Sequence, residues 1–179
     1  DYTNPLSDKT KLELGLEYRT DKTNNTNFTD QEIYTFDNSG NISGTTSIGN
    51  SNFDFKRNIY SGYINYATSF DKFTMQLGAR LEDFNVEGLF NRVGQNPDPV
   101  TDHIFTVYPS AFFTFSPSEK NQWQFSYSRR VDRPGIQQVN PIREWSTPLI
   151  VSIGNPDLVP QFTNSFELNY TRQIKGGNL

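Results

Sequence analysis

The sequence predicts an all-β fold, an antiparallel up-and-down meander of about six strands. Three observations predict it: stretches of alternating apolar and polar residues, connections that are long and short in turn, and no long segment with a helical 3.6-residue apolar period. Only 34% of the 179 residues are hydrophobic, yet 15% are aromatic. Disordered chains are poor in aromatic residues, so a polar but folded β-protein fits this composition.

Six stretches alternate with a period of two residues and are the expected strands. Two of them are imperfect, because apolar residues occur on both faces: Ile59 and Tyr63 are out of phase in the second stretch, and Ile104, Tyr108 and Phe112 in the fourth. The expected strands are residues 11–19, 57–69, 72–83, 104–115, 122–130 and 162–174.

The connections between these strands alternate in length. A tight turn around Phe70 and the short segment 116–121 contrast with long links at 20–56, 84–103 and 131–161. Long structureless loops are uncommon in compact soluble domains, whereas outer-membrane barrels combine short periplasmic turns with long external loops. Strands of about 9–11 residues also suit a tilted transmembrane strand. Residues 1–179 are therefore expected to form an arc of a transmembrane β-barrel.

One face of the expected strands is apolar and the other is polar, as lipid and a watery lumen require. Leu12, Phe73, Leu77, Phe125 and Phe166 belong to the apolar face. A soluble all-β surface module, with binding loops in its long links, is the alternative. The fate of this face separates the two hypotheses, because lipid contact supports a barrel and a packed second sheet supports a soluble module.

Two charges break the apolar face. Arg129 and Arg172 both lie toward the ends of expected strands, where a charge costs less than the roughly 2–4 kcal/mol expected for Arg at the bilayer midplane. Amphipathic aromatic side chains are expected at the membrane interfaces. The candidates for these aromatic girdles are Tyr18, Trp123, Tyr127 and Tyr170.

The sequence offers little catalytic or cofactor chemistry. Without cysteine there is no disulfide, thiolate nucleophile or Cys-based metal site, and one histidine, His103, expected in a loop, makes neither a multi-His site nor a triad. The segment 37–41 lacks the spacing of a calcium loop. A net charge of -4 without a basic stripe argues against nucleic acid. We therefore expect no enzyme and no cofactor.

The stretch YSRRVDRPGIQQVNPI (127–142), followed by GNPDLVPQFTNSFELNY (154–170), resembles the barrel of TonB-dependent receptors. It is most similar to the outer-membrane β-barrel family common in Bacteroidetes. The residues that carry this resemblance are Arg129, Arg130, Arg133, Pro134, Asn140, Pro141, Gly154, Asn155, Pro156, Leu158, Pro160, Asn164 and Glu167.

The resemblance implies a piece of a larger receptor in the outer membrane of a Gram-negative cell. Such receptors close a 22-stranded barrel around a plug and import large nutrients, such as iron chelates or glycans, with energy passed on by TonB. This chain supplies about six strands and no recognisable plug domain, and it is expected to begin and end in periplasmic turns, NPLSDK and KGGNL. The implied partners are outer-membrane lipid, the rest of the barrel, the plug and, through the plug, TonB.

The motif residues are expected to be structural. Gly154 is expected to supply backbone conformations that other residues resist, Pro156 to hold Asn155 extended, and Pro160 to lie where a missing N–H costs least. The segment 154–160 then sets the entry angle of the last strand. A second expectation is a charged cluster, interpreted as an ordinary hydrated barrel rim. Its members are Arg129, Arg130, Arg133, Arg143 and Glu144.

Overall fold

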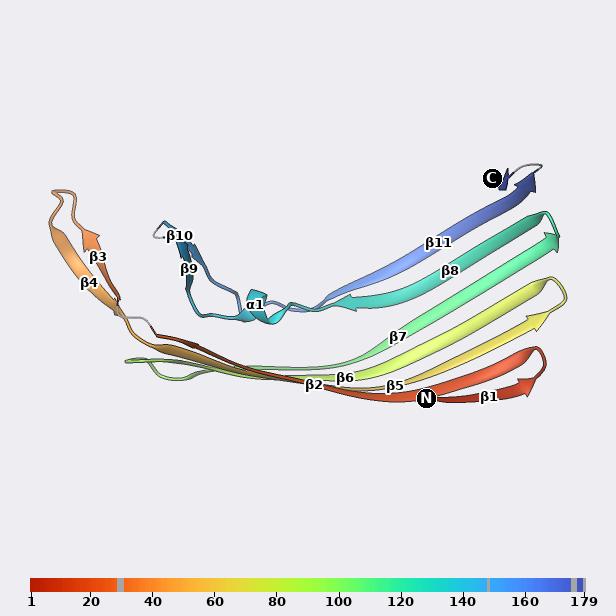
Figure 1. Ribbon diagram of the computed structural model, residues 1–179, viewed down its shortest axis with the longest axis horizontal. Helices are drawn as coiled ribbons and strands as arrows, with labels where there is room; N and C mark the ends of the chain where they lie inside the picture. Colours follow the sequence, from red (N-terminus) through yellow and green to blue (C-terminus); the bar gives the residue numbers. More distant parts are fainter. Residues whose placement is uncertain (29–30, 148, 175–176, 179) are drawn as a thin grey trace.

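The computed structural model describes residues 1–28, 31–147, 149–174 and 177–178, and these form one wide curved sheet with two smaller hairpins (Figure 1). The strand order of the sheet is β1-β2-β5-β6-β7-β8-β11-β12, and neighbouring strands are antiparallel. This order confirms the predicted meander, here an open arc with β1 and β12 at its edges. The strands of the sheet are β1 (Tyr2–Ser7), β2 (Thr10–Asn27), β5 (Ser51–Phe70), β6 (Phe73–Arg92), β7 (Asp98–Ser118), β8 (Asn121–Asp132), β11 (Gln161–Ile174) and β12 (Gly177–Asn178).

Short elements occupy the long connections. One hairpin is β3 (Gln31–Phe36) with β4 (Ile42–Ile48), and the other is β9 (Glu144–Thr147) with β10 (Ile150–Ser152). A single helical turn, α1 (Ile136–Val139), precedes β9 and is too short to show in the sequence as a helical apolar period.

The six expected strands all exist, but most are longer than predicted. The links 20–56 and 84–103 were wrongly expected to be loops: β2 continues to Asn27, β6 runs to Arg92, and β7 already begins at Asp98. The turn expected in NPLSDK is mostly strand β1, which pairs with β2. Of the turn expected in KGGNL, residues 175–176 and 179 lie outside the described residues.

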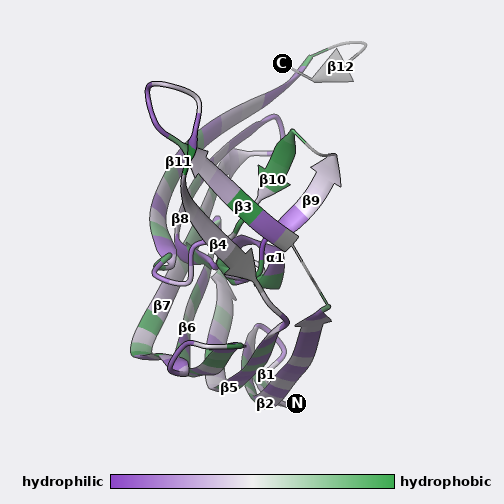
Figure 2. Cartoon of the chain, turned by 90° about the vertical axis from the view of Figure 1, so that its left-hand side faces the viewer, coloured by the Kyte–Doolittle hydropathy of each residue, from purple (hydrophilic) through white to green (hydrophobic). Residues whose placement is uncertain are grey.

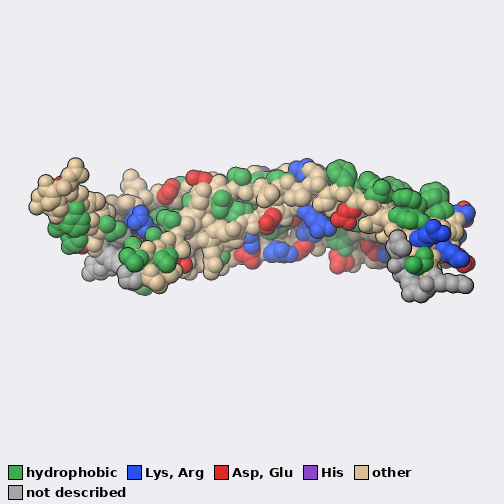
Figure 3. Space-filling model, turned by 90° about the horizontal axis from the view of Figure 1, so that it is seen from above, with side chains coloured by type: hydrophobic (Ala, Val, Ile, Leu, Met, Phe, Trp, Pro, Cys, Tyr) green, Lys and Arg blue, Asp and Glu red, His purple; other side chains and the backbone are tan. Residues whose placement is uncertain are grey.

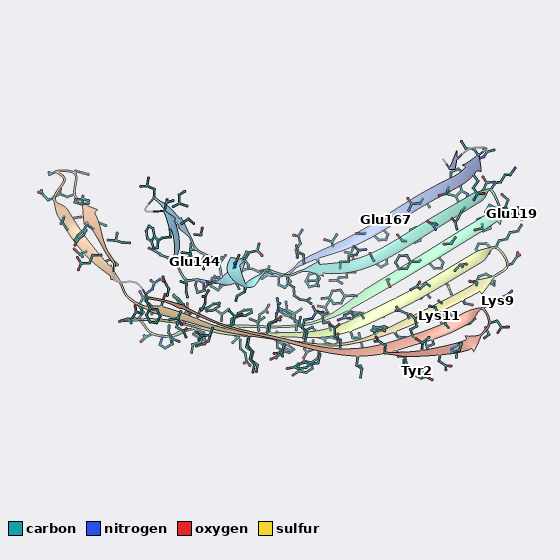
Figure 4. The ribbon with its side chains drawn as sticks, viewed as in Figure 1. Tyr2, Lys9, Lys11, Glu119, Glu144 and Glu167 are labelled. Carbon is teal, nitrogen blue, oxygen red and sulfur yellow. The ribbon has the colours of Figure 1, made fainter. Side chains whose placement is uncertain are left out.

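The short turns lie together at one end of the sheet. They join β1 to β2, β5 to β6 and β7 to β8, and Figure 4 shows Lys9 and Glu119, from the first and the last of them, at this same end. Asp71 has a φ of 49°, the left-handed conformation that a two-residue hairpin turn demands and that Asp tolerates better than most residues. The short turns are thereby confirmed, and the connections β2–β5 and β8–β11 are long as expected, whereas the β6–β7 connection is only the short segment 93–97.

The register sorts side chains onto two faces. One cross-strand row consists of Leu12, Tyr66, Leu77, Ala111, Tyr127 and Phe166. The next row, on the opposite face, consists of Glu13, Asn65, Gly78, Ser110, Ser128 and Ser165. Figure 2 shows this alternation as bands along the strands, and Figure 3 shows hydrophobic side chains gathered along one side near the turns.

The apolar face, called here the outer face, is left uncovered by the described elements. Leu77 is 40% exposed and Phe166 is 69% exposed. A soluble domain of this size would bury such a contiguous surface against a second layer. The observed exposure therefore favours the barrel over the soluble module.

Aromatic pairs border this apolar band. Near the turns, Phe73 stacks on Phe115 with ring centroids 4.6 Å apart, and farther along the strands Tyr18 stacks on Tyr60 at 4.8 Å. On β5 the two borders are Phe70 and Tyr60, so at about 3.3 Å per residue and a tilt of about 40° the band is about 25 Å tall. That height matches the apolar band of an outer-membrane barrel.

Beyond Tyr18 and Tyr60 the polarity of the two faces reverses. The inner face now carries buried Phe53, Ile59 and Phe84, whereas the outer face carries polar side chains such as Lys56 and Glu87. The reversal explains why Ile59 and Ile104 were out of phase in the sequence, whereas Tyr108 lies on the turn side of the border and is an inner-face aromatic residue of the membrane half. His103 lies on β7, not in a loop, with its Nε2 2.5 Å from an oxygen of Asp83.

Candidate lumen-facing site

A segment between β8 and β11 lies against the inner face of the sheet, on its concave side (Figure 1). We call residues 133–143 and 153–160 the strap. The Asn27 side-chain amide of β2 donates a hydrogen bond of 3.4 Å to the backbone carbonyl of Arg143, which places the strap on the inner face. Val139 and Ile142 of the strap are 8% and 3% exposed. The strap is thus a packed layer inside the wall.

The strap covers the apolar inner patch beyond the membrane band. Val139 and Leu158 face Phe53 and Phe84 across a cavity of ≈ 40 Å³, which Pro134, Pro156 and Pro160 also line. That volume is about that of one or two water molecules. Three of the motif prolines therefore pack as apolar side chains, and this contact is a small core and not a ligand pocket.

Gly154 joins the two ends of the strap. Its N–H donates to the carbonyl of Asn140 at 2.8 Å, and the N–H of Asn155 donates to the carbonyl of Gln138 at 2.7 Å. A Cβ on Gly154 would lie 2.6 Å from both carbonyl oxygens. The backbone of Gly154 is outside the left-handed region, so the expectation that it supplies unusual conformations is wrong: close backbone approach is the reason for glycine.

Two motif asparagines hold the turns of the strap. The side-chain oxygen of buried Asn140 accepts the N–H of Ile142 at 3.1 Å, and that of Asn155 accepts the N–H of Asp157 at 3.0 Å. Side chains of Asn commonly replace backbone acceptors in such turns. Pro141 follows the first of these asparagines.

Arg133 ties the strap to the wall electrostatically. Its guanidinium pairs with Glu82, donates to the Tyr108 hydroxyl at 3.1 Å and lies 4.6 Å over the ring of Phe84. The Glu82 side chain is 7% exposed. Burial lowers the pKa of Arg133, and Arg57, Arg80 and Arg19 lower it further by repulsion. Arginine nevertheless remains charged at neutral pH, so Glu82 always meets a cation here.

The ion pair belongs to a network that crosses four strands. Arg80 contacts Glu82 at 3.4 Å, Glu17 at 2.6 Å and the Ser61 hydroxyl at 2.6 Å. Glu17 also pairs with Arg19 at 2.6 Å. Sequence reasoning missed this site, although Glu82 and Arg80 on the polar face and Tyr108 out of phase were its signals.

The expected cluster of Arg129, Arg130 and Arg133 with Arg143 and Glu144 does not form. Arg133 pairs with Glu82 instead, and no ion pair in the described parts of the chain links Glu144 to these arginines. Figure 4 shows Glu144 on the β9–β10 hairpin, away from the wall. The separation arises because β9 and β10 rise from the strap toward the open side of the sheet.

The remaining motif residues lie on β8 and β11. Arg129 lies 5.0 Å over the ring of Phe162, and Asn164 accepts a hydrogen bond of 3.1 Å from the Tyr127 hydroxyl. Arg130 is exposed, and Glu167 is exposed opposite Ser126 (Figure 4). These residues stay outside the strap.

The strap and the wall are joined by ion pairs and hydrogen bonds. Over the described ranges, no group of three or more His, Cys, Asp or Glu side chains is arranged to hold a metal ion. No helix of the described residues is long and apolar enough to cross a membrane.

An antiparallel arc with an apolar outer band about 25 Å tall and a polar, strapped inner face defines a wall segment of an outer-membrane β-barrel. A family model described as "Outer membrane protein beta-barrel family" matches residues 1–179. The chain belongs to this family and is therefore an outer-membrane protein. Searches of curated proteins and of solved structures returned no match to it.

Proposed function

We propose that the chain is part of the barrel of a TonB-dependent receptor that takes up large nutrients, such as iron chelates or glycans, and that the strap shapes the passage through it. The observation that carries the proposal is the strap itself. The motif residues between Arg133 and Pro160, on which the resemblance to such receptors rests, come together as one packed unit on the inner face. A wall that only sealed the membrane would need no such inner layer.

The proposed partners follow from the two faces and the edges. Outer-membrane lipid contacts the exposed apolar band, the rest of the barrel continues from the edges of the sheet, and a plug fills the interior and passes on energy from TonB. The polar inner face below the strap suits contact with such a hydrated plug. The role is non-catalytic, with no cofactor and no nucleic acid as partner.

The experiment uses the full-length gene product in its own cells. We expect uptake of its nutrient to require both the protein and TonB, and the purified receptor to bind the periplasmic domain of TonB. Glu82→Gln should reduce uptake at an unchanged amount of folded receptor, because it removes the charge that holds Arg133. Glu13→Gln, which breaks the exposed Lys11–Glu13 pair away from the strap, is the matched control. Uptake independent of TonB would refute the proposal.

A further inference from the structure

The wall is not continuously hydrogen-bonded between β7 and β8. Their register runs from Ser118 opposite Asn121 only to Ser110 opposite Ser128, although β7 continues back to Asp98 and β8 on to Asp132. The next residue of β7 is Pro109, which has no N–H to donate. Beyond it, Figure 1 shows β8 and β11 diverging from β7. We call the interval between residues 98–109 and 129–132 the seam.

Side chains fill the seam in place of a backbone ladder. Phe162 of β11 stacks toward Tyr108 of β7 with ring centroids 6.4 Å apart, and Arg129 of β8 covers Phe162 at 5.0 Å. Tyr108 is buried, and Arg129 is half-buried. Arg129 is thus the cation at the outer side of the seam.

The backbone of Arg129 lies at the depth of the lipid hydrocarbon. It is on the same face as Trp123, which belongs to the aromatic border near the turns, and six residues beyond it. At about 3.3 Å per residue and about 40° tilt its Cα lies about 15 Å into a band of about 25 Å. Its guanidinium lies over Phe162, which pairs with Val131 two residues nearer the outer border, so the charge reaches toward the lipid head groups. Arg129 is near the end of β8, as expected, but that strand ends within the band because the chain turns inward to the strap.

The Arg129 guanidinium has no counter-ion among the residues that the structure describes. No carboxylate of the described residues pairs with it, no hydrogen bond from it is found among them, and its Nε is buried without an acceptor. Guanidinium carries five donors and cannot lose its charge. Ionisable groups at membrane depth are normally paired, so the described residues do not supply the partner that such a charge requires.

Polar neighbours and an apolar surface frame a place for an anion. Asn164 is the cross-strand partner of Arg129, and its side-chain oxygen is taken by the Tyr127 hydroxyl, which leaves its amide nitrogen as a donor. Toward the turns, Tyr127 stacks on Phe166 at 4.7 Å, and Phe125 is also exposed. Donors beside a lipid-facing apolar surface match an amphiphile with an anionic head.

We propose that Arg129 and Asn164 bind the phosphate of an outer-membrane lipid whose acyl chains lie along Phe166 and Phe125. The planar guanidinium fork matches phosphate oxygens in pairs, which favours this group. The bound phosphate neutralises Arg129 and closes the outer side of the seam where the backbone ladder is absent.

The test is native mass spectrometry of the full-length receptor in detergent, titrated with dioleoylphosphatidylglycerol or with a neutral galactolipid of the same chain length. We expect the phospholipid to bind the wild type and Arg129→Gln to weaken that binding about 10- to 100-fold, as loss of charge-assisted hydrogen bonds predicts. Arg130→Gln is the matched control, because Arg130 is adjacent but on the inner face and should leave binding unchanged.

Folding is checked for each variant by the mobility shift on boiling, and Arg129→Lys, which keeps the charge but loses the fork, should bind weakly if Arg129→Gln does not fold. Equal phospholipid binding by wild type and Arg129→Gln would overturn the proposal. So would equal binding of the neutral lipid, or displacement by millimolar inorganic phosphate, which would indicate a free-anion site.

Discussion

The long strands have two halves whose apolar side chains lie on opposite faces of the sheet. In the half near the turns, the outer face is apolar and the inner face is polar, with Leu77 exposed outside and Gln76 inside. Beyond Tyr18 and Tyr60 the arrangement reverses, with Phe53 and Phe84 buried inside under the strap. Alternation with a period of two residues is kept throughout, and only the phase relative to the barrel changes.

This difference shows that the medium on each side of the wall decides which face of a strand is apolar. Lipid makes the outer face of the first half apolar, whereas in the second half water surrounds the wall and the apolar side chains turn inward to a protein layer. The strap is that layer. The position of the reversal therefore marks the outer boundary of the membrane.

The strongest test compares one substitution on the inner face of both halves. Phe53→Ala should lower the free energy of unfolding by about 3–5 kcal/mol, because Phe53 is 1% exposed beneath the strap. Phe112→Ala, on the inner face within the membrane half, should change it by less than about 0.5 kcal/mol, because Phe112 is 43% exposed. Urea unfolding of the full-length protein in detergent measures both. Equal effects would contradict the reversal.

The outer face offers the second comparison. Leu77→Arg should destabilise the membrane-inserted protein by about 2–4 kcal/mol, the range for arginine facing lipid at the midplane. Leu89→Arg, on the outer face of the same strand beyond the aromatic border, should be nearly neutral. The folded fraction in lipid vesicles, read from mobility with and without boiling, distinguishes the two. A costly Leu89→Arg would place the boundary elsewhere.

The third comparison concerns the close backbone contact at Gly154, which a single added Cβ atom should weaken. Gly154→Ala should cost about 1–3 kcal/mol, because its Cβ would lie 2.6 Å from two backbone carbonyl oxygens. Gly135→Ala is the control, since its Cβ would approach only the flexible Gln138 side chain, at 3.7 Å. Limited proteolysis of intact cells should cut the strap faster in the first variant alone. Equal cleavage of the two variants would mean that the contact at Gly154 does not hold the two segments of the strap together.

How much the sequence predicts differs between these halves. Lipid imposes one outward phase, so the membrane parts of β2, β6 and β11 follow from alternation alone. The sequence did not predict the outer parts of β2 and β6 as strands. Their apolar residues lie on the opposite face, and this alternation can be interpreted as a strand only once the strap that covers that face is known. The strap packs through Gly, Pro and Asn, and the pairing of Arg133 with Glu82 joins positions far apart in the sequence, which no local pattern reveals.

The smallest effect concerns the β3–β4 hairpin, far from both faces of the wall. Backbone N–H groups of Asn41, Ser39 and Gly40 lower the pKa of Asp37, with Asn41 the largest cause. A lowered folded-state pKa means that this stabilisation is present above the unfolded value of about 4 and is lost as pH falls through the folded value.

A spin label on Ser39→Cys, in a chain without cysteine, should become more mobile below about pH 4. In an Asp37→Asn background the pH dependence should vanish, because that side chain no longer titrates; a persisting transition would assign it to another group.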